Sequence, residues 1–204
     1  MKQHYVMPVG VDDFRRVREE YYYVDKTDFI KKLLDGHAQA TLITRPRRFG
    51  KTLALSMLYY FFSNKDAEAN RVLFEGSKIE AAGAQYMAEQ GSRPVVFLSL
   101  KDVKEDNFEG MLAGVATAMQ SAYDSFRYLQ EGEVLSGQEK QYFQRVLEGK
   151  ASNVDMQLSL KNLTAFLARF YGKPALVLID EYDAPLQYAW DYGYYDEAIV
   201  FIRN

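Results

Sequence analysis

The stretch Arg45-Pro-Arg-Arg-Phe-Gly-Lys-Thr-Leu53 links a short apolar run to a segment with helical periodicity. The run before it, residues 40–44, is apolar and β-branched, which predicts a buried parallel strand. After it, apolar residues recur at helical spacing, at Leu53, Met57, Tyr60 and Phe61. Strand, loop and helix in this order are typical of a phosphate-binding loop.

The triplet Gly50-Lys51-Thr52 supplies the chemistry of such a loop. Backbone N–H groups at a helix start lack intrahelical acceptors and, with the helix dipole, favour an anionic phosphate. In this interpretation Lys51 reaches the β- and γ-phosphates, and Thr52 offers its hydroxyl to Mg²⁺. The residues expected to bind ATP are Arg47, Arg48, Phe49, Gly50, Lys51, Thr52 and Leu53.

The loop departs from the usual Gly-x-x-x-x-Gly-Lys-Ser/Thr pattern, because Arg45 stands where the first glycine is expected. Pro46 fixes φ there but donates no N–H group. Arg47 and Arg48 add guanidinium groups that suit bidentate phosphate contacts. The triplet alone also fits an ordinary turn before a surface helix.

A second motif lies far along the chain, where the apolar run 175–179 ends in Asp180-Glu181-Tyr182-Asp183. The run predicts a central parallel strand that delivers carboxylates to its C-terminal edge, where open α/β sheets bind ligands. Asp180 fits a Mg²⁺-binding role, and Glu181 fits the residue that orients the attacking water. The alternative is that Asp180 and Asp183 start a turn and cap the segment at Pro185.

Three segments together resemble the AAA-ATPase-like family of bacterial proteins. They are Tyr23-Val-Asp-Lys-Thr27, Leu42-Ile-Thr-Arg-Pro-Arg-Arg-Phe-Gly-Lys-Thr52 and Val177-Leu-Ile-Asp-Glu-Tyr-Asp-Ala-Pro185. The family itself departs from glycine at the first loop position. The resemblance implies ATP binding at Gly50, Lys51 and Thr52, with Asp180 and Glu181 as the acidic pair. Family members are typically longer, with a region similar to PD-(D/E)xK nucleases that has no counterpart here.

We therefore expect an α/β P-loop NTPase fold, with a mainly parallel central sheet flanked by helices and one domain over residues 1–204. The candidate strands are residues 40–44, 95–100 and 175–179, whereas proteins similar to P-loop ATPases usually have about five. The helix-like segment 194–204 ends without a cap or breaker. We expect the domain to be incomplete at its C-terminus, with an effector region beyond it.

Further helices are expected at 11–20, 25–36, 66–74, 81–89, 108–126, 136–149 and 160–170. A capping-box pattern at Ser136 and Glu139 opens one of them. The extended segment Tyr21–Val24 has two interpretations: contact with the adenine base, or core packing.

Composition narrows the functional classes. The chain is 48% apolar and 26% charged, has no cysteine, and carries a formal net charge of −3. These values favour a folded globular protein without disulfides, thiolate metal sites or a general attraction to nucleic acid. His4 and His37 are too isolated for a metal cluster, and Arg15, Arg16 and Arg18 fit a solvated helix face balanced by Glu19 and Glu20. Without a signal peptide or membrane span, we expect a cytoplasmic protein.

The function expected from these residues is MgATP binding and hydrolysis that acts as a conformational switch for an attached effector. Lys51 neutralises phosphate charge, Thr52 and Asp180 position Mg²⁺, and Glu181 polarises the water. The alternatives are a small-molecule kinase, a nucleotide-sensing or scaffolding module without turnover, and a DNA-directed ATPase. The missing sensor region and Arg45 favour the module without turnover.

Overall fold

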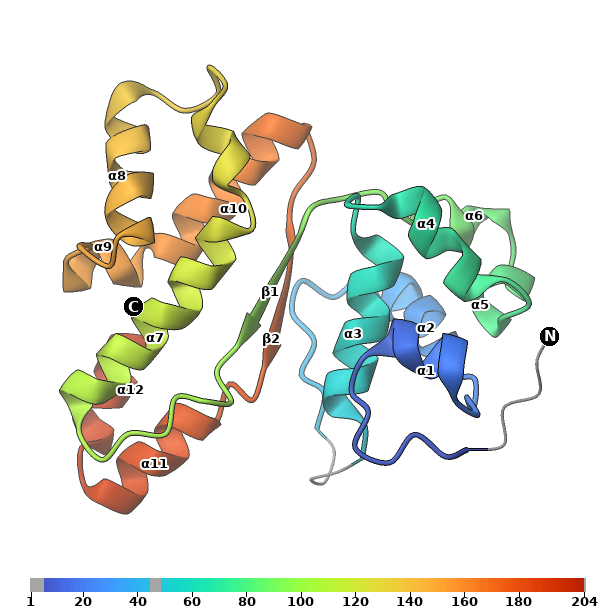
Figure 1. Ribbon diagram of the computed structural model, residues 1–204, viewed down its shortest axis with the longest axis horizontal. Coiled ribbons are helices and arrows are strands. Elements are labelled where there is room, and N and C mark those ends of the chain that lie inside the picture. The colour runs from blue at the N-terminus through green and yellow to red at the C-terminus, as the bar shows by residue number, and fades with distance from the viewer. Residues whose placement is uncertain (1–5, 45–48, 204) are drawn as a thin grey trace. The chain divides into compact units, whose positions relative to one another are not determined.

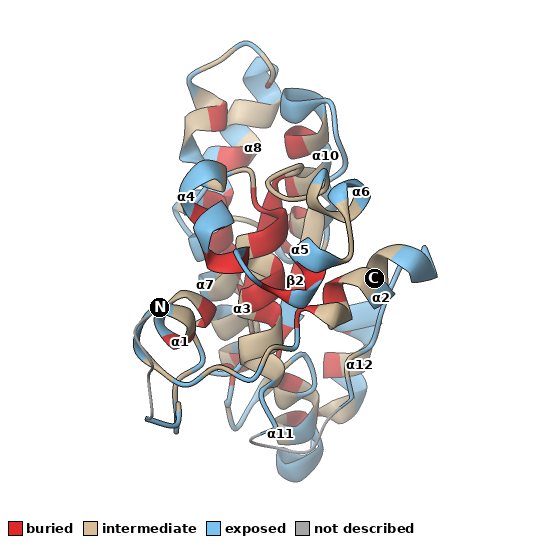
Figure 2. Ribbon diagram, turned by 90° about the vertical axis from the view of Figure 1, so that its right-hand side faces the viewer, coloured by how far each residue is buried: buried red, intermediate tan, exposed pale blue. Residues whose placement is uncertain are grey.

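A computed structural model describes residues 6–44 and 49–203 (Figure 1). The chain divides into two compact units, an N-terminal unit of residues 1–95 and a C-terminal unit of residues 96–204. Each unit has buried residues of its own, which Figure 2 shows in red. The single domain expected over 1–204 stays a prediction.

The N-terminal unit is helical in the part that the structure describes. Its elements are α1 (Phe14–Glu20), α2 (Asp28–Gly36), α3 (Lys51–Phe62), α4 (Ala67–Arg71), the 3₁₀ helix η1 (Val72–Phe74), α5 (Lys78–Ala81) and α6 (Ala84–Met87). Three fully buried rings from α1, α3 and η1 form the centre of its core. Phe14 stacks on Phe74 at 5.3 Å between ring centroids, and Phe61 meets Phe74 edge to face at 5.1 Å.

A turn before α2 ties two distant parts of this unit together. Asp25 Oδ1 accepts hydrogen bonds from the backbone N–H and the hydroxyl of Thr27, at 2.8 and 2.7 Å. The Thr27 hydroxyl in turn accepts a hydrogen bond from the N–H of Ile79, in α5. Because Thr27 is fully buried, these bonds compensate for the loss of its contacts with water.

The C-terminal unit contains nearly all of the sheet and the longest helices. Its elements are β1 (Val95–Ser99, which begins at the unit boundary), α7 (Phe108–Asp124), the 3₁₀ helix η2 (Arg127–Gln130), α8 (Gly137–Leu147), α9 (Asn153–Gln157), α10 (Ser159–Tyr171), β2 (Leu176–Asp180), α11 (Ala184–Tyr192) and α12 (Tyr195–Arg203). The expected capping box is confirmed, because Ser136 and Glu139 exchange side-chain to backbone hydrogen bonds at the start of α8.

The two strands pair side by side and are parallel (Figure 1). The N–H of Leu100, just after β1, donates to the carbonyl of Asp180, the last residue of β2, at 3.0 Å. The carboxyl ends of both strands therefore meet at the same edge. Helices α7 to α10 form the crossover between the strands, as a parallel connection requires.

One face of this sheet packs on the core of the C-terminal unit. Val96 and Leu98 of β1 belong to the same buried cluster as Met111 of α7 and Leu163 of α10, and Val177 of β2 packs against it. The observed fold is therefore α/β, with a small parallel sheet flanked by helices. The strands expected at 95–100 and 175–179 are confirmed within one residue at each end.

The strand expected at residues 40–44 is wrong. These residues, all of them described, form no regular element, and Leu42 is 64% exposed. His37 ends α2 in the left-handed region at φ 47°, and the chain then runs irregularly. A β-branched run forms a strand only with a neighbouring strand and a buried face, and residues 40–44 have neither in this structure.

Candidate functional site

The start of α3 has the geometry that a phosphate-binding helix requires. Gly50 is the N-cap and adopts the left-handed conformation, with φ 71° and ψ 33°. Only glycine takes up that conformation without a steric cost, so the glycine of the triplet is needed to turn the chain into the helix. Lys51, Thr52 and Leu53 then occupy the first helical turn, whose N–H groups have no acceptor within the helix.

The residues before Gly50 belong to the same expected set. Phe49 is described and 66% exposed, so its ring is not part of the core. Arg47 and Arg48 lie outside the described residues. Thus Phe49 to Leu53, five of the seven expected ATP-binding residues, are placed by the structure as consecutive positions at one helix start.

The acidic pair follows β2. Asp180 is the last residue of that strand and is 3% exposed, and Glu181 has a positive φ of 50°. The chain then turns, because the N–H of Ala184 donates to the carbonyl of Glu181 at 3.0 Å. A non-glycine residue in the left-handed region is strained, and such strain is often retained at functional sites.

The alternative interpretation, in which Asp180 and Asp183 start a turn and cap the next segment, agrees with the structure only in part. Asp183 stands at the N-cap of α11 and Pro185 lies in its first turn, as that interpretation expects. The Asp183 side chain, however, makes no capping hydrogen bond. Asp180 does not belong to the turn at all, since it is paired within the sheet.

The basic loop and the acidic pair lie in different units: Lys51 and Thr52 in the N-terminal unit, Asp180 and Glu181 in the C-terminal unit. Within each unit, the expected site residues are adjacent in sequence, at the start of α3 and at the end of β2. That both halves contact one nucleotide belongs to the proposal below.

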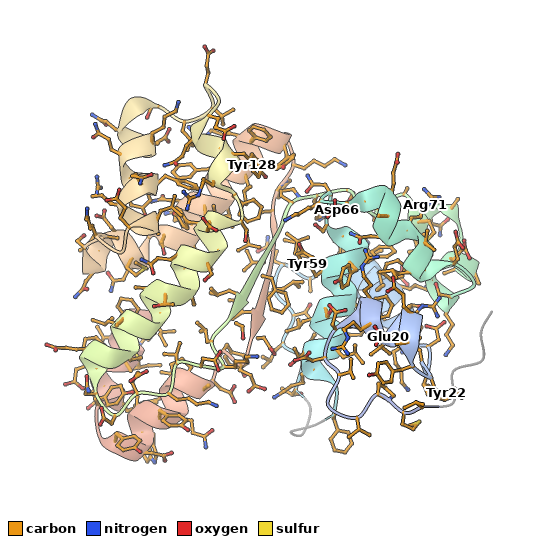
Figure 3. The ribbon with its side chains drawn as sticks, viewed as in Figure 1. Glu20, Tyr22, Tyr59, Asp66, Arg71 and Tyr128 are labelled. Atoms are coloured by element: carbon orange, nitrogen blue, oxygen red, sulfur yellow. The ribbon has the colours of Figure 1, made fainter. Side chains whose placement is uncertain are left out.

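Tyrosines 21–23 precede α2, and one of them packs in the core. The Tyr23 ring meets Phe14 edge to face at 5.4 Å, and its hydroxyl accepts a hydrogen bond from the N–H of Lys26. Burial raises the pKa of Tyr23 to about 12, so its hydroxyl stays protonated. Tyr22 and Val24, by contrast, are 52% and 51% exposed, and Figure 3 shows the Tyr22 side chain. Core packing therefore accounts for Tyr23.

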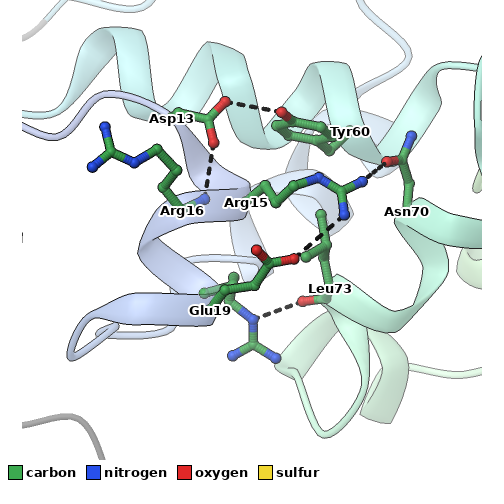
Figure 4. Close-up of polar contacts among 8 residues, drawn as sticks. Asp13, Arg15, Arg16, Glu19, Tyr60, Asn70 and Leu73 are labelled. Atoms are coloured by element: carbon green, nitrogen blue, oxygen red, sulfur yellow. Dashed lines mark hydrogen bonds and ion pairs between the residues drawn. The ribbon is translucent and has the colours of Figure 1, made fainter.

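The basic cluster of α1 is held by internal contacts (Figure 4). Arg15 pairs with Glu19, as expected for a balanced helix face, and also donates to the side-chain oxygen of Asn70 at 2.6 Å. Arg18 donates to the carbonyl of Leu73 at 2.7 Å. These two guanidinium groups therefore stabilise the contact of α1 with α4 and η1.

Sequence reasoning missed two features. One is the network that joins Asp25 and Thr27 to α5. The other is Ser99, the last residue of β1, whose hydroxyl is buried beside the end of β2. The signal for Ser99 was available, since it is a polar residue that ends an apolar strand, as Asp180 is.

The described residues show neither a clustered metal site nor a membrane-spanning helix. Among residues 6–44 and 49–203, no group of three or more histidine, cysteine or acidic side chains gathers to hold a metal ion. In the same ranges, no helix has the length and apolar character needed to cross a membrane.

Comparison with known proteins identifies the family. The family model described as "Predicted AAA-ATPase" matches residues 8–204. An uncharacterized protein in the vnfD 5′ region of Azotobacter chroococcum mcd 1 is 40% identical over 75 residues. That match covers 36% of this chain and 13% of the relative's length. No solved structure matches the chain. The match over residues 8–204 confirms the expected resemblance: the chain belongs to the Predicted AAA-ATPase family.

Proposed function

We propose that the chain is a P-loop ATPase domain that binds MgATP at the start of α3. The observation that carries this proposal is the left-handed Gly50 directly before Lys51 and Thr52, at the first two positions of a twelve-residue helix. In the proposed complex, the N–H groups of the first turn, the Lys51 ammonium and the Thr52 hydroxyl contact the phosphates near the positive end of the helix dipole. A triphosphate is the ligand that uses all of them.

In the proposed site, the acidic end of β2 completes the binding of the cation. Thr52 supplies a hydroxyl oxygen and Asp180 a carboxylate oxygen, and both are ligands of the kind that Mg²⁺ prefers. Mg²⁺ usually keeps several waters and takes only one or two protein oxygens beside the phosphates. Bound Mg²⁺ would neutralise charge that develops on the γ-phosphate.

The remaining residues have separate roles in the proposal. Lys51 stabilises phosphate charge, and Arg47, Arg48, Phe49 and Leu53 complete the loop. Glu181 accepts a hydrogen bond from the attacking water and orients it towards the γ-phosphate. Hydrolysis then changes the order of loops around the nucleotide and acts as a switch for an attached effector.

The experiment measures MgATP binding by calorimetry and phosphate release by a coupled assay. We expect Lys51→Ala to weaken MgATP binding by about 10-fold or more, because it removes a charge-assisted contact. Glu181→Gln should bind MgATP normally and release phosphate at least about 100-fold more slowly than the parent chain. Lys32→Ala removes a lysine whose side chain is 73% exposed on α2, and this matched control should behave as the parent chain does.

A second candidate is a nucleotide-sensing module without turnover. The observation that favours it is Arg45 in place of the first loop glycine. Tight MgATP binding that needs Lys51, with no phosphate release above background, would identify this module. Binding that is indifferent to Lys51→Ala would refute both candidates. Phosphate release that rises with added DNA and falls at high salt would instead identify a DNA-directed ATPase.

A further inference from the structure

Ser99 has a buried hydroxyl that the structure leaves without a hydrogen bond. Among the side chains of residues 6–44 and 49–203, the Ser99 Oγ is a buried polar atom that lacks a hydrogen-bond partner. Burying a hydroxyl without a compensating hydrogen bond costs free energy, and such groups are rare in folded proteins. A buried hydroxyl of this kind at a strand end can donate a hydrogen bond to, or accept one from, a ligand that binds there.

The register of the sheet puts this hydroxyl next to the acidic pair. In a parallel ladder, the hydrogen bond from the Leu100 N–H to the Asp180 carbonyl makes Leu100 the neighbour of Glu181. Ser99 is then the neighbour of Asp180 on the adjacent strand. Adjacent strands are about 4.8 Å apart, so the two residues lie side by side at the carboxyl edge of the sheet.

Both side chains also lie on the same face of the sheet. Successive residues of a strand point to opposite faces. Val96 and Leu98 of β1 pack on the core of the C-terminal unit, and Val177 of β2 packs on the same core. Ser99 directly follows Leu98 in β1, and Asp180 lies an odd number of positions after Val177 in β2. Both side chains therefore lie on the opposite face of the sheet. The hydroxyl and the carboxylate are therefore lateral neighbours in register.

We propose that the Ser99 hydroxyl is a further positioning group of the nucleotide site, where it accepts a hydrogen bond from a water of hydration of the cation held by Asp180. This inference rests on the proposed MgATP function. A water that binds a cation through its oxygen donates hydrogen bonds through its two O–H groups. The Ser99 hydroxyl can accept one of these hydrogen bonds. Asp180 binds the cation through its carboxylate, and Ser99 fixes the orientation of the adjoining water.

The proposal predicts opposite effects on binding and on stability. Ser99→Ala removes a hydroxyl that has no partner in the ligand-free protein, so its thermal unfolding temperature should stay the same or rise. The same substitution should weaken only the part of nucleotide affinity that depends on the cation. A merely structural serine would instead lower the unfolding temperature and affect binding with and without the cation alike.

The experiment titrates ADP into the full chain by calorimetry, once with Mg²⁺ and once with EDTA. The quantity compared is the dissociation constant in EDTA divided by the dissociation constant in Mg²⁺. This ratio isolates the contribution of the cation to ADP affinity. For Ser99→Ala we expect this ratio to fall by about three- to ten-fold, as the loss of one hydrogen bond predicts. Ser99→Thr keeps the hydroxyl and should retain the ratio. Ser125→Ala, in which the lost hydroxyl bonds only to the Ser121 carbonyl, is the matched control.

A second readout measures binding of the cation directly. Mn²⁺ replaces Mg²⁺, and the free Mn²⁺ signal in electron paramagnetic resonance reports binding of the cation with ADP. Ser99→Ala should release Mn²⁺ at concentrations where the parent chain and Ser99→Thr retain it.

The outcomes separate this inference from the function on which it rests. If Lys51→Ala abolishes MgADP binding while Ser99→Ala leaves the Mg²⁺-dependent ratio unchanged, the role of Ser99 is refuted and the nucleotide site stands. If Ser99→Ala and Ser99→Thr weaken binding equally, with and without Mg²⁺, the hydroxyl has no cation-dependent role. If the parent chain binds no nucleotide, both proposals fail together.

Discussion

The carboxylate of Asp25 accepts a hydrogen bond from the backbone N–H of Lys78 at 2.7 Å, across 53 positions of sequence. Lys78 is the first residue of α5, and the N-cap residue Ser77 makes no side-chain capping bond. Asp25, together with the Thr27 hydroxyl that accepts from Ile79, therefore satisfies the N–H groups at this helix start. A turn from one part of the unit acts as the cap for a helix in another.

Removal of this carboxylate should destabilise the N-terminal unit. We expect Asp25→Ala to lower the free energy of unfolding by about 2 kcal/mol, because it leaves buried donors unsatisfied. Denaturant unfolding followed by circular dichroism measures the change. Asp28→Ala is the control, since its exposed carboxylate pairs with the exposed Lys32 and its loss should cost about 0.5 kcal/mol or less. Equal losses in both variants would contradict the capping role of Asp25.

The same contact predicts a dependence of stability on pH. Burial raises the pKa of Asp25, but hydrogen bonds from Thr27 and Lys78 lower it, and the net shift is below the ordinary value. A depressed pKa in the folded state means that the contribution is complete above the unfolded-state pKa of about 3.9 and is lost as the pH falls through the folded-state value. Unfolding measured from pH 7 down to pH 2 should show a decline at low pH that is smaller in Asp25→Asn. An identical decline in both proteins would rule out a contribution from Asp25.

The hydroxyl of Thr27 should matter more than its methyl group. Thr27 is fully buried and bonds through its hydroxyl to both Asp25 and Ile79. Thr27→Val keeps the shape but loses both bonds, so we expect a loss of about 2 kcal/mol in unfolding free energy. Thr27→Ser keeps the bonds and loses one methyl group, which should cost about 1 kcal/mol. The order of the two melting temperatures is the test, and a more stable Thr27→Val would disprove the argument.

Replacement of Glu181 by glycine should relieve backbone strain. Its φ of 50° places it in the left-handed region, which costs a non-glycine residue about 1 kcal/mol. We expect Glu181→Gly to be at least as stable as the parent, because the relief of strain offsets the greater freedom of the unfolded chain. Thermal and denaturant unfolding measure this.

The matched control for that substitution is Asp183→Gly, two residues later. Asp183 has φ −84° and ψ −16°, so glycine there relieves no strain and only increases the freedom of the unfolded chain. This variant should be less stable than the parent. Should Glu181→Gly be destabilised as much as Asp183→Gly, strain at Glu181 is not significant.

Tyr123 should contribute a hydrogen bond to the core of the C-terminal unit. The side chain is fully buried and its hydroxyl donates to the Ser159 carbonyl at 2.7 Å, which links α7 to α10. Burial raises its pKa well above the ordinary value, so the hydroxyl remains a donor at all physiological pH values. Tyr123→Phe should cost about 1 kcal/mol or more. The same change at Tyr182, which is 46% exposed, should have little effect on unfolding.

Local signals in the sequence predicted the elements that local interactions define. The capping box at Ser136 and the apolar runs of β1 and β2 were recognised because each is contained in a few neighbouring residues. The start of α3 was predicted in the same way, since Gly50 is the residue that the left-handed N-cap requires. The helices expected at 66–74 and 81–89 occur as shorter pieces.

Features that depend on distant partners could not be predicted in this way. Residues 40–44 have strand propensity, but propensity does not provide a neighbouring strand. The bond between Asp25 and Lys78 joins two segments that show no shared pattern in the sequence. The sequence shows Ser99 as a polar residue that ends an apolar strand, but only the structure shows that its hydroxyl is buried without a partner and that Ser99 neighbours Asp180.

The connection between β1 and β2 has a consequence for how the C-terminal unit forms. Residues 100–175 lie between the strands, so the chain must close a long loop before Leu100 can donate to Asp180. The entropy of that closure is lost before any sheet contact compensates for it, which slows folding. Helices α7 to α10 shorten the distance when they form first. We therefore expect a refolding pathway in which helical circular dichroism recovers early and protection of the Leu100 amide from solvent exchange appears last.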